Sequence, residues 1–257
     1  MINNKDDVKK QYEKTENLKA RISIHDKYST NKTGFANWIF SNYRIENGMN
    51  ILELGCGTGS MWKGREDLIR RSGKIVLSDF SEGMVEQSKN TIGEYDNVEY
   101  MLIDIQDIPF EDNSFDIVIA NMMLYHVPDI DKGLIEVKRV LKDGGDFYTA
   151  TYGEHGIMEY LAELLGRYGV TDKASRAFTL QNGQKILEPY FDNVKMLRYE
   201  DSLAVTNVDD LVDYVCSLSN MSTLASIPKD EIREVLTEHM KDGVLMVPKE
   251  YGMFVAT

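Results

Sequence analysis

The stretch that decides the fold reads ILELGCGTG from Ile51 to Gly59. It begins with a short apolar run, broken only by Glu53, and continues with three glycines at alternate positions. Glycines allow a sharp turn, and they let the backbone approach a ligand without a clash from Cβ. A glycine-rich loop after a first strand lies at the ligand crevice of doubly wound sheets. By itself the loop is weak evidence, because an ordinary tight turn between strand and helix also explains it.

Further apolar runs follow the same pattern along the chain. Together with the first run at 49–54, they lie at residues 74–78, 98–103, 115–120 and 147–151. Such β-branched runs, bounded by Gly, Asp or Asn, predict buried strands of a parallel sheet. We expect one helix to begin after Ser81 as its N-cap, and another at Lys132–Leu141, stopped by Gly144 and Gly145. Alternating strands and helices predict a doubly wound α/β fold.

The flanks of this core have a different composition. Residues 1–45 are polar and are expected to form a helical N-terminal cap. Residues 46–257 are expected to form one domain, with helical insertions at about 153–191 and 207–243 that carry apolar stripes at helical spacing. The division between core and cap therefore falls near residue 45.

Two more strands are expected near the end of the chain. One covers 193–206, with a turn near Glu200 and Asp201, and the last covers 251–256. The predicted fold is therefore α/β and Rossmann-like. It has a mainly parallel, doubly wound sheet of seven strands with an antiparallel last strand, plus the helical cap and insertions.

Acidic residues stand at three successive strand ends. Asp79 ends the second run, where a carboxylate can accept hydrogen bonds from both hydroxyls of a ribose. Asp104 ends the third, where it can accept from an adenine amino group. Either aspartate alone could be a turn or cap residue. Together with Glu53 they favour a nucleoside site.

The loop's spacing and charge discriminate between cofactors. A dinucleotide fingerprint reads GxGxxG, whereas the third glycine comes one residue early in this chain, and no GxxxxGK[ST] phosphate loop is present. No Lys or Arg follows the loop until Lys63. The carboxylate of Glu53 would oppose a pyrophosphate. It suits a ligand with an ammonium, a sulfonium and a single carboxylate, which is S-adenosylmethionine (SAM).

The segment from Ile51 to Thr151 resembles a known family at this point. Its matching motifs read ELGCGTG, LSDFSEGM, DIQDIPFEDNSFDIVIANMMLYHVPD and EVKRVLKDGGDFYTAT. They are similar to the methyltransferase domain of the ubiquinone/menaquinone-biosynthesis type, within the class I SAM-dependent methyltransferases. The resemblance implies methyl transfer from SAM, with S-adenosylhomocysteine as product, but it does not specify the acceptor.

The resemblance also implies a set of cofactor contacts. The glycines would approach the methionine and ribose, Glu53 would order the amino-acid end, and Asp79 would hold the ribose hydroxyls. Phe80 would flank the adenine, which Asp104 and the backbone of Ile105 would read. The expected cofactor residues of this core are Glu53, Gly55, Cys56, Gly57, Gly59, Asp79, Phe80, Met84, Asp104, Ile105 and Asn121. Trp62 departs from the family, which often has small or aliphatic residues there.

Methyl transfer from a sulfonium is a direct displacement, so alignment and exclusion of water are the main catalytic devices. A base is needed only if the acceptor must lose a proton. Tyr125 and His126 follow the fourth strand and His155 follows the fifth, so these are the catalytic candidates, with a packing or capping role open for each. Tyr28 lies in a polar segment that is a candidate lid over the cofactor, and a surface role is equally open.

Composition narrows the class of acceptor. The 29 basic and 42 acidic residues give a net charge of −13, which disfavours a nucleic-acid partner. The residues from Asn121 to Leu124 also lack the [DN]PP[YFW] signature of adenine N-methylation. A small-molecule acceptor is therefore expected. RNA or protein methylation, a SAM-binding regulator and an NAD-binding reductase remain as alternatives.

Other functions find little support in the sequence. Cys56 and Cys216 are far apart and stand in no metal-ligand spacing, so no metal site is expected. The chain has no apolar run of transmembrane length, so a cytoplasmic protein without membrane insertion is expected, as a monomer or homodimer.

Overall fold

A computed structural model of the chain describes residues 15–218, 221 and 224–257. It divides into two compact units. The sheet unit comprises Ile39–Thr151, Ala177–Leu197 and Gly252–Thr257, and the described residues of the helical unit lie within 15–38, Tyr152–Arg176 and Arg198–Tyr251. The first part of the predicted N-terminal cap, residues 1–14, lies outside the described residues. These units are defined by packing, and the predicted domain boundary near residue 45 stays a prediction.

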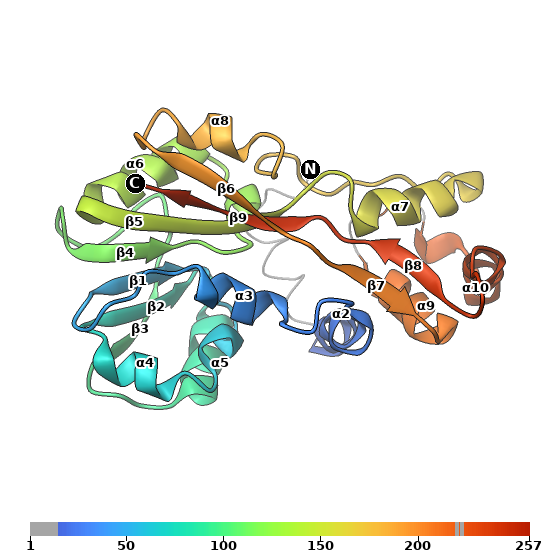
Figure 1. Cartoon of the computed structure of the whole chain (residues 1–257), viewed down its shortest axis with the longest axis horizontal. Helices are drawn as coiled ribbons and strands as arrows, with labels where there is room; N and C mark the ends of the chain where they lie inside the picture. Colours follow the sequence, from blue (N-terminus) through green and yellow to red (C-terminus); the bar gives the residue numbers. More distant parts are fainter. Residues whose placement is uncertain (1–14, 219–220, 222–223) are drawn as a thin grey trace. The chain divides into compact units, whose positions relative to one another are not determined.

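In the described part of the chain, the main sheet has seven strands in the order β3-β2-β1-β4-β5-β9-β6 (Figure 1). Neighbours from β3 to β5 pair in parallel. At the other edge, Asn193 and Thr257 exchange N–H···O bonds of 3.2 and 3.0 Å, the pattern of an antiparallel pair. The predicted fold class is confirmed. The strands are β1 Ile51–Leu54, β2 Ile75–Asp79, β3 Val98–Leu102, β4 Phe115–Ile119, β5 Leu141–Tyr152, β6 Val194–Tyr199 and β9 Tyr251–Ala256.

The central strands are buried on both faces. Every residue of β1 is buried, although successive side chains of a strand point to opposite faces. Helices must therefore cover both faces, as in other parallel sheets. The helices of this unit are α4 Glu66–Arg71, α5 Glu82–Ile92, α6 Ile130–Val140 and α8 Gly183–Leu187, while α3 Phe35–Ser41 begins in the helical unit and ends in this one. The loops that leave β1 to β4 at their carboxyl ends carry the predicted site.

The helical unit has a core of its own. The predicted apolar stripe of residues 157–165 contributes Ile157, Leu161 and Leu165, all buried, to a cluster with Val215 and Leu236. Figure 1 shows its helices gathered around the β7–β8 hairpin. Its elements are α2 Thr15–Tyr28, α7 Ile157–Leu164, β7 Ser202–Val205, α9 Val208–Ser217, α10 Lys229–Glu238 and β8 Leu245–Pro248. Of the helical stretch predicted at 207–243, residues 219–220 and 222–223 lie outside the described residues.

One local prediction was wrong, and two were confirmed in part. Helix α6 ends at Val140 before it reaches Gly144 and Gly145, which lie within β5, where the register against β4 shifts, so these glycines do not stop it. Ser81 is the N-cap of α5 as predicted, although its side chain makes no capping hydrogen bond. The predicted strand over 193–206 divides at the expected turn, yet its second half, β7, pairs with β8 in a separate sheet. The sequence analysis did not predict β8, because it is only four residues long.

Candidate cofactor site

Asp79 connects two loops at the carboxyl edge of the sheet. It ends β2, and its Oδ2 accepts a hydrogen bond from the backbone N–H of Gly57 (3.0 Å), while Oδ1 accepts from Ser81 (2.9 Å). Burial raises the pKa of Asp79, and its backbone N–H partners oppose that shift. A carboxylate offers about four acceptor positions. Asp79 is therefore positioned to hold the glycine loop and to accept hydrogen bonds from ligand hydroxyls.

The glycine loop has one side closed by protein and one side open. Gly55 has φ +73°, and a Cβ there would lie 3.0 Å from two side-chain carbons of Met123. Gly57 has φ +56°, and a Cβ there would meet nothing within 4 Å. The close contact at Gly55 requires glycine for packing. The open space beside Gly57, by contrast, leaves the backbone accessible to a ligand.

Glu53 is a buried carboxylate, with only 3% of its surface exposed. The fully buried indole of Trp62 donates its N–H to Oε2 of Glu53. Burial raises the pKa of Glu53 to about 7, although the hydrogen bond from Trp62 lowers it. A nearby positive charge would favour the ionised form of such a group. Glu53 therefore suits a ligand that brings a cation. The sequence marked Trp62 only as a departure from the family, not as the partner of Glu53.

The loop after β3 fixes Asp104 in place. The backbone N–H and the side-chain amide of Gln106 both donate to Oδ1 of Asp104, each at 3.0 Å. The next residue, Ile105, is buried and lies against Gly133 of α6. Beside Asp79, the ring of Phe80 is 41% exposed, which is unusual for a large apolar side chain. An exposed ring and an anchored carboxylate on neighbouring strand ends can accommodate a purine.

The remaining predicted cofactor residues of this unit lie along the same loops. Cys56 is buried with a free thiol, and its backbone N–H donates to Ser78 at 2.8 Å. Met84 is half-buried in the first turn of α5. Asn121, just after β4, is buried. Its side-chain carbonyl accepts from the N–H of Ala150 (3.0 Å), and its amide donates to the hydroxyl of Tyr43 (2.6 Å). Tyr43 was not among the cofactor residues predicted from the sequence.

The backbone is strained where β4 meets its loop. Met122 has φ +54°, a conformation that non-glycine residues other than Asn and Asp seldom adopt. The backbone N–H of Met122 donates to Ala150 (2.8 Å), and Met123 packs against Gly55. Strain of this kind is often found at functional sites. The loops after β1 and β4 thus meet at this point.

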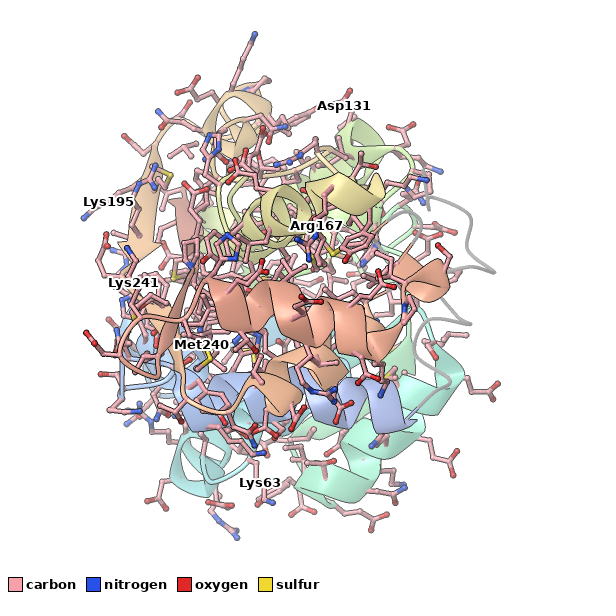
Figure 2. All side chains as sticks on the ribbon, turned by 90° about the vertical axis from the view of Figure 1, so that its right-hand side faces the viewer. Lys63, Asp131, Arg167, Lys195, Met240 and Lys241 are labelled. Carbon is pink, nitrogen blue, oxygen red and sulfur yellow. The ribbon has the colours of Figure 1, made fainter. Side chains whose placement is uncertain are left out.

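The basic residues that follow the glycine loop are directed elsewhere. Lys63 is exposed, and its side chain extends outward in Figure 2. The guanidinium of Arg65 lies over the ring of Phe40, 3.8 Å from its centroid. Neither side chain provides a phosphate-binding cation at the glycine loop in this arrangement. The buried Glu53 adds a negative charge there instead.

The two catalytic candidates of this unit are adjacent in a short 3₁₀ turn, Leu124–His126. Tyr125 is buried, and its ring centroid lies 4.6 Å from that of His126. In the described structure Nδ1 of His126 is buried without a hydrogen-bond partner. Burial lowers the pKa of His126, so the imidazole is neutral near pH 7. A neutral imidazole can accept a proton.

Tyr28 and His155, by contrast, belong to the helical unit. The hydroxyl of Tyr28 donates to Asp210 of α9 at 2.5 Å. His155 is exposed and pairs through Nδ1 with Glu159 at 3.0 Å, which raises its pKa. The predicted site residues are thus distributed over two units. Those of the sheet unit come together at one sheet edge, and roles for Tyr28 and His155 remain predictions.

Comparison with known proteins defines the class of this site. Residues 52–149 match the model of a family described as "Methyltransferase domain". The matched segment contains the strands β1 to β4 with their loops and most of β5. Residues 52–149 of the chain therefore form a methyltransferase domain.

Two curated relatives and one solved structure illustrate the similarity. Demethylmenaquinone methyltransferase of Staphylococcus aureus is 36% identical over 107 residues, which are 42% of this chain and 44% of the relative. The ubiquinone/menaquinone biosynthesis C-methyltransferase UbiE of Escherichia coli is 33% identical over 127 residues, 48% of this chain and 50% of the relative. The chain thus matches about half the length of these relatives or less.

The solved structure is a phosphoethanolamine N-methyltransferase of Haemonchus contortus, in complex with phosphomonomethylethanolamine and S-adenosylhomocysteine. It has a TM-score of 0.58 and 19% identity, and the match covers 96% of this chain and 58% of the other. At this identity the similarity supports the fold alone.

Proposed function

We propose that the chain transfers a methyl group from SAM to a small-molecule O, N or C acceptor. The main support for this proposal is that acidic residues at neighbouring strand ends surround a glycine loop with an accessible backbone. Asp79 accepts hydrogen bonds from backbone N–H groups of the loops after β1 and β2, and the buried carboxylate of Glu53 lies near it. This combination suits a nucleoside whose other end is cationic.

In this proposal each group of the site has one task. When bound, SAM supplies a methyl group on a sulfonium, which an acceptor atom takes by direct displacement. Asp79 accepts hydrogen bonds from the ribose hydroxyls, and the open backbone at Gly57 lets the ligand approach. Glu53 balances the ammonium of the amino-acid end, and Phe80 with Asp104 holds the adenine. The protein thus contributes alignment, which accounts for much of the rate in a displacement reaction.

A general base enters the proposal only for acceptors that must lose a proton. His126 is the stronger candidate, because its imidazole is neutral and its Nδ1 has no protein partner in the described structure. Tyr125, His155 and the lid residue Tyr28 are kept as further proposals. A methyl-transfer assay of His126→Asn against pH tests the base: the proposed role requires loss of the acidic limb of the rate profile.

Binding and turnover test the proposal separately. Calorimetry on the full chain is expected to detect SAM and S-adenosylhomocysteine, but not NAD. A screen for transfer of a labelled methyl group to small metabolites is then expected to give a product. Binding of NAD without SAM would overturn the cofactor, and labelled RNA or protein with no labelled metabolite would overturn the acceptor class. SAM binding without any turnover would favour a regulatory protein.

Location and partners are proposed from the sequence. No helix among residues 15–218, 221 and 224–257 is long and apolar enough to cross a membrane. The acidic composition supports a small-molecule partner over a nucleic acid, and the cytoplasm is the expected compartment. Sedimentation of the purified chain distinguishes the monomer from the homodimer.

A further inference from the structure

A second candidate binding site lies wholly within the helical unit. It is a pocket with about 500 Å³ of empty space, its open mouth included. Its walls come from residues 152–158 at the end of β5 and the start of α7, from residues 172–176, from α9, and from residues 250–251 where β9 begins. The pocket is distinct from the candidate cofactor site, because every lining residue belongs to the helical unit.

Three tyrosines form the aromatic part of the wall: Tyr152, Tyr214 and Tyr251. The hydroxyl of Tyr152 donates to the carbonyl of Ser175 at 2.7 Å, which fixes that ring. The rings of Tyr214 and Tyr251 each lie 6.2 Å from the ring of His25, nearly perpendicular to it. Burial raises the pKa of all three tyrosines, so the phenols are neutral. The pocket therefore has ordered aromatic rings, whose faces attract cations.

Carboxylates form the polar part of the wall. Glu154, Asp172 and Glu250 line the pocket, with Arg176 as the lining cation among the described residues. Arg176 lies 2.8 Å from Asp172 and 3.7 Å from Glu154. Glu250 pairs with Arg198, outside the lining, at 3.0 Å. Even with both arginines counted, three carboxylates face two guanidinium groups. The surplus negative charge favours a cationic ligand and opposes an anion.

We propose that this pocket binds a small organic ammonium compound. The ammonium group lies against the tyrosine rings and the carboxylates, while its carbon substituents contact the apolar side chains of Ile157 and Met158. Shape and charge then act together, because a neutral ligand of the same size would fill the space without the electrostatic attraction. The proposal concerns binding only and does not depend on SAM or on methyl transfer.

The first test compares two probes of equal shape on the full chain. Choline carries a quaternary ammonium, and 3,3-dimethylbutan-1-ol is its neutral carbon analogue. Saturation-transfer NMR and calorimetry are expected to show that choline binds at least about tenfold more tightly, because only choline gains the attraction of its charge to the aromatic rings and the carboxylates. Equal affinities, tighter binding of acetate, or no binding of choline at millimolar concentration would each overturn the proposal.

The second test locates the probe in the pocket. Tyr152→Phe keeps the ring, and choline affinity is expected to stay within about twofold, whereas Tyr152→Leu removes it and is expected to cost about three- to tenfold. Glu154→Gln is expected to weaken binding by a similar factor. Glu163→Gln is the matched control, because Glu163 is exposed on α7 and does not line the pocket. Circular dichroism verifies each fold. Equal losses in Glu154→Gln and Glu163→Gln would mean that choline binds elsewhere.

Discussion

The two units of this chain build their candidate sites in different ways. In the sheet unit, each site residue lies within two residues of the end of a strand. Glu53, Asp79, Asp104 and Asn121 come in chain order from four strands of one sheet. The pocket of the helical unit is assembled from four separate parts of the chain. A site made at successive strand ends follows from local pattern, whereas a site made by distant segments depends on tertiary packing. Substitutions in each unit test how far their stabilities and binding sites differ and whether the two units are independent.

The largest effect is expected from a buried ion pair in the helical unit. Lys249 pairs with Asp201, their side chains only 4% and 0% exposed, and Lys249 also donates to Ser29 at 2.9 Å. Lys249→Met leaves the carboxylate buried without its charge partner, which is expected to lower the free energy of unfolding by about 3–5 kcal/mol. Chemical denaturation measures the free energy of unfolding of this variant and of the control Lys241→Met, which changes an exposed lysine. If the units are independent, SAM affinity of the folded variant stays unchanged. A parallel loss of SAM affinity would show that they are coupled.

The next effect concerns the anchor of the sheet unit. Asp79→Asn replaces a carboxylate that accepts hydrogen bonds from two backbone N–H groups and, in the proposal, from the ribose of SAM. Because an amide is a weaker acceptor, the affinity for SAM is expected to fall about ten- to hundredfold. Calorimetry measures the change. Asp96→Asn removes an equal charge from an exposed position before β3 and is expected to leave the affinity unaltered. Unchanged binding in Asp79→Asn would remove this residue from the proposed site.

A pH dependence is expected from Glu53. Its pKa is raised to about 7, so the carboxylate is protonated below that pH and ionised above it. SAM affinity should therefore rise as pH increases from about 6 to 8, by roughly tenfold, because only the ionised form attracts an ammonium. Glu53→Gln should lose this part of the dependence, while any titration of the ligand itself persists in the variant.

Trp62 provides an independent check on that assignment. Trp62→Phe removes the hydrogen bond that favours ionised Glu53, so the midpoint of the pH dependence should move upward. A midpoint that is the same in wild type, Trp62→Phe and Glu53→Gln would assign the titration to another group.

The smallest expected effect separates backbone strain from close packing. Gly55 and Gly64 have φ of +73° and +77°, but an added Cβ meets Met123 only at Gly55. Gly64→Ala is expected to destabilise the fold by about 1 kcal/mol through conformation alone. Gly55→Ala is expected to cost about 1 kcal/mol more, because Met123 must shift. Thermal unfolding of both variants gives the difference, and equal values would mean that Met123 yields without cost.

The sequence predicted most of the sheet unit, because its signals are local. The strand after Met49 and the acids at Asp79 and Asp104 could be identified from short runs and their end residues. The contacts that it missed in this unit are hydrogen bonds between side chains, one across 9 residues and one across 78. Trp62 and Tyr43, which bond to Glu53 and Asn121, carry no pattern that names their partner.

The helical unit was predicted only as helices with apolar faces. Its strands β7 and β8 pair across about forty residues that include the helices α9 and α10, and neither strand is longer than four residues. The pocket could not be predicted from the sequence either, because its lining residues are distant in the chain. Tyr152, Asp172, Tyr214 and Glu250 come together only in the tertiary structure. Tyrosines and acidic residues do occur in each of several of these segments, but their presence in the sequence does not predict that they line the same pocket.

The antiparallel edge of the main sheet has a consequence for how the chain folds. Strand β6 ends at Tyr199 and β9 begins at Tyr251, yet the two are neighbours in the sheet. The segment 200–250 that connects them contains the β7–β8 pair and the helices α9 and α10. Pairings between distant residues form slowly, because the ends of a long loop must first meet. Unless the intervening helices form early and draw those ends together, this edge of the sheet is completed last. Refolding of Lys249→Met should then show a slower final phase than the wild type.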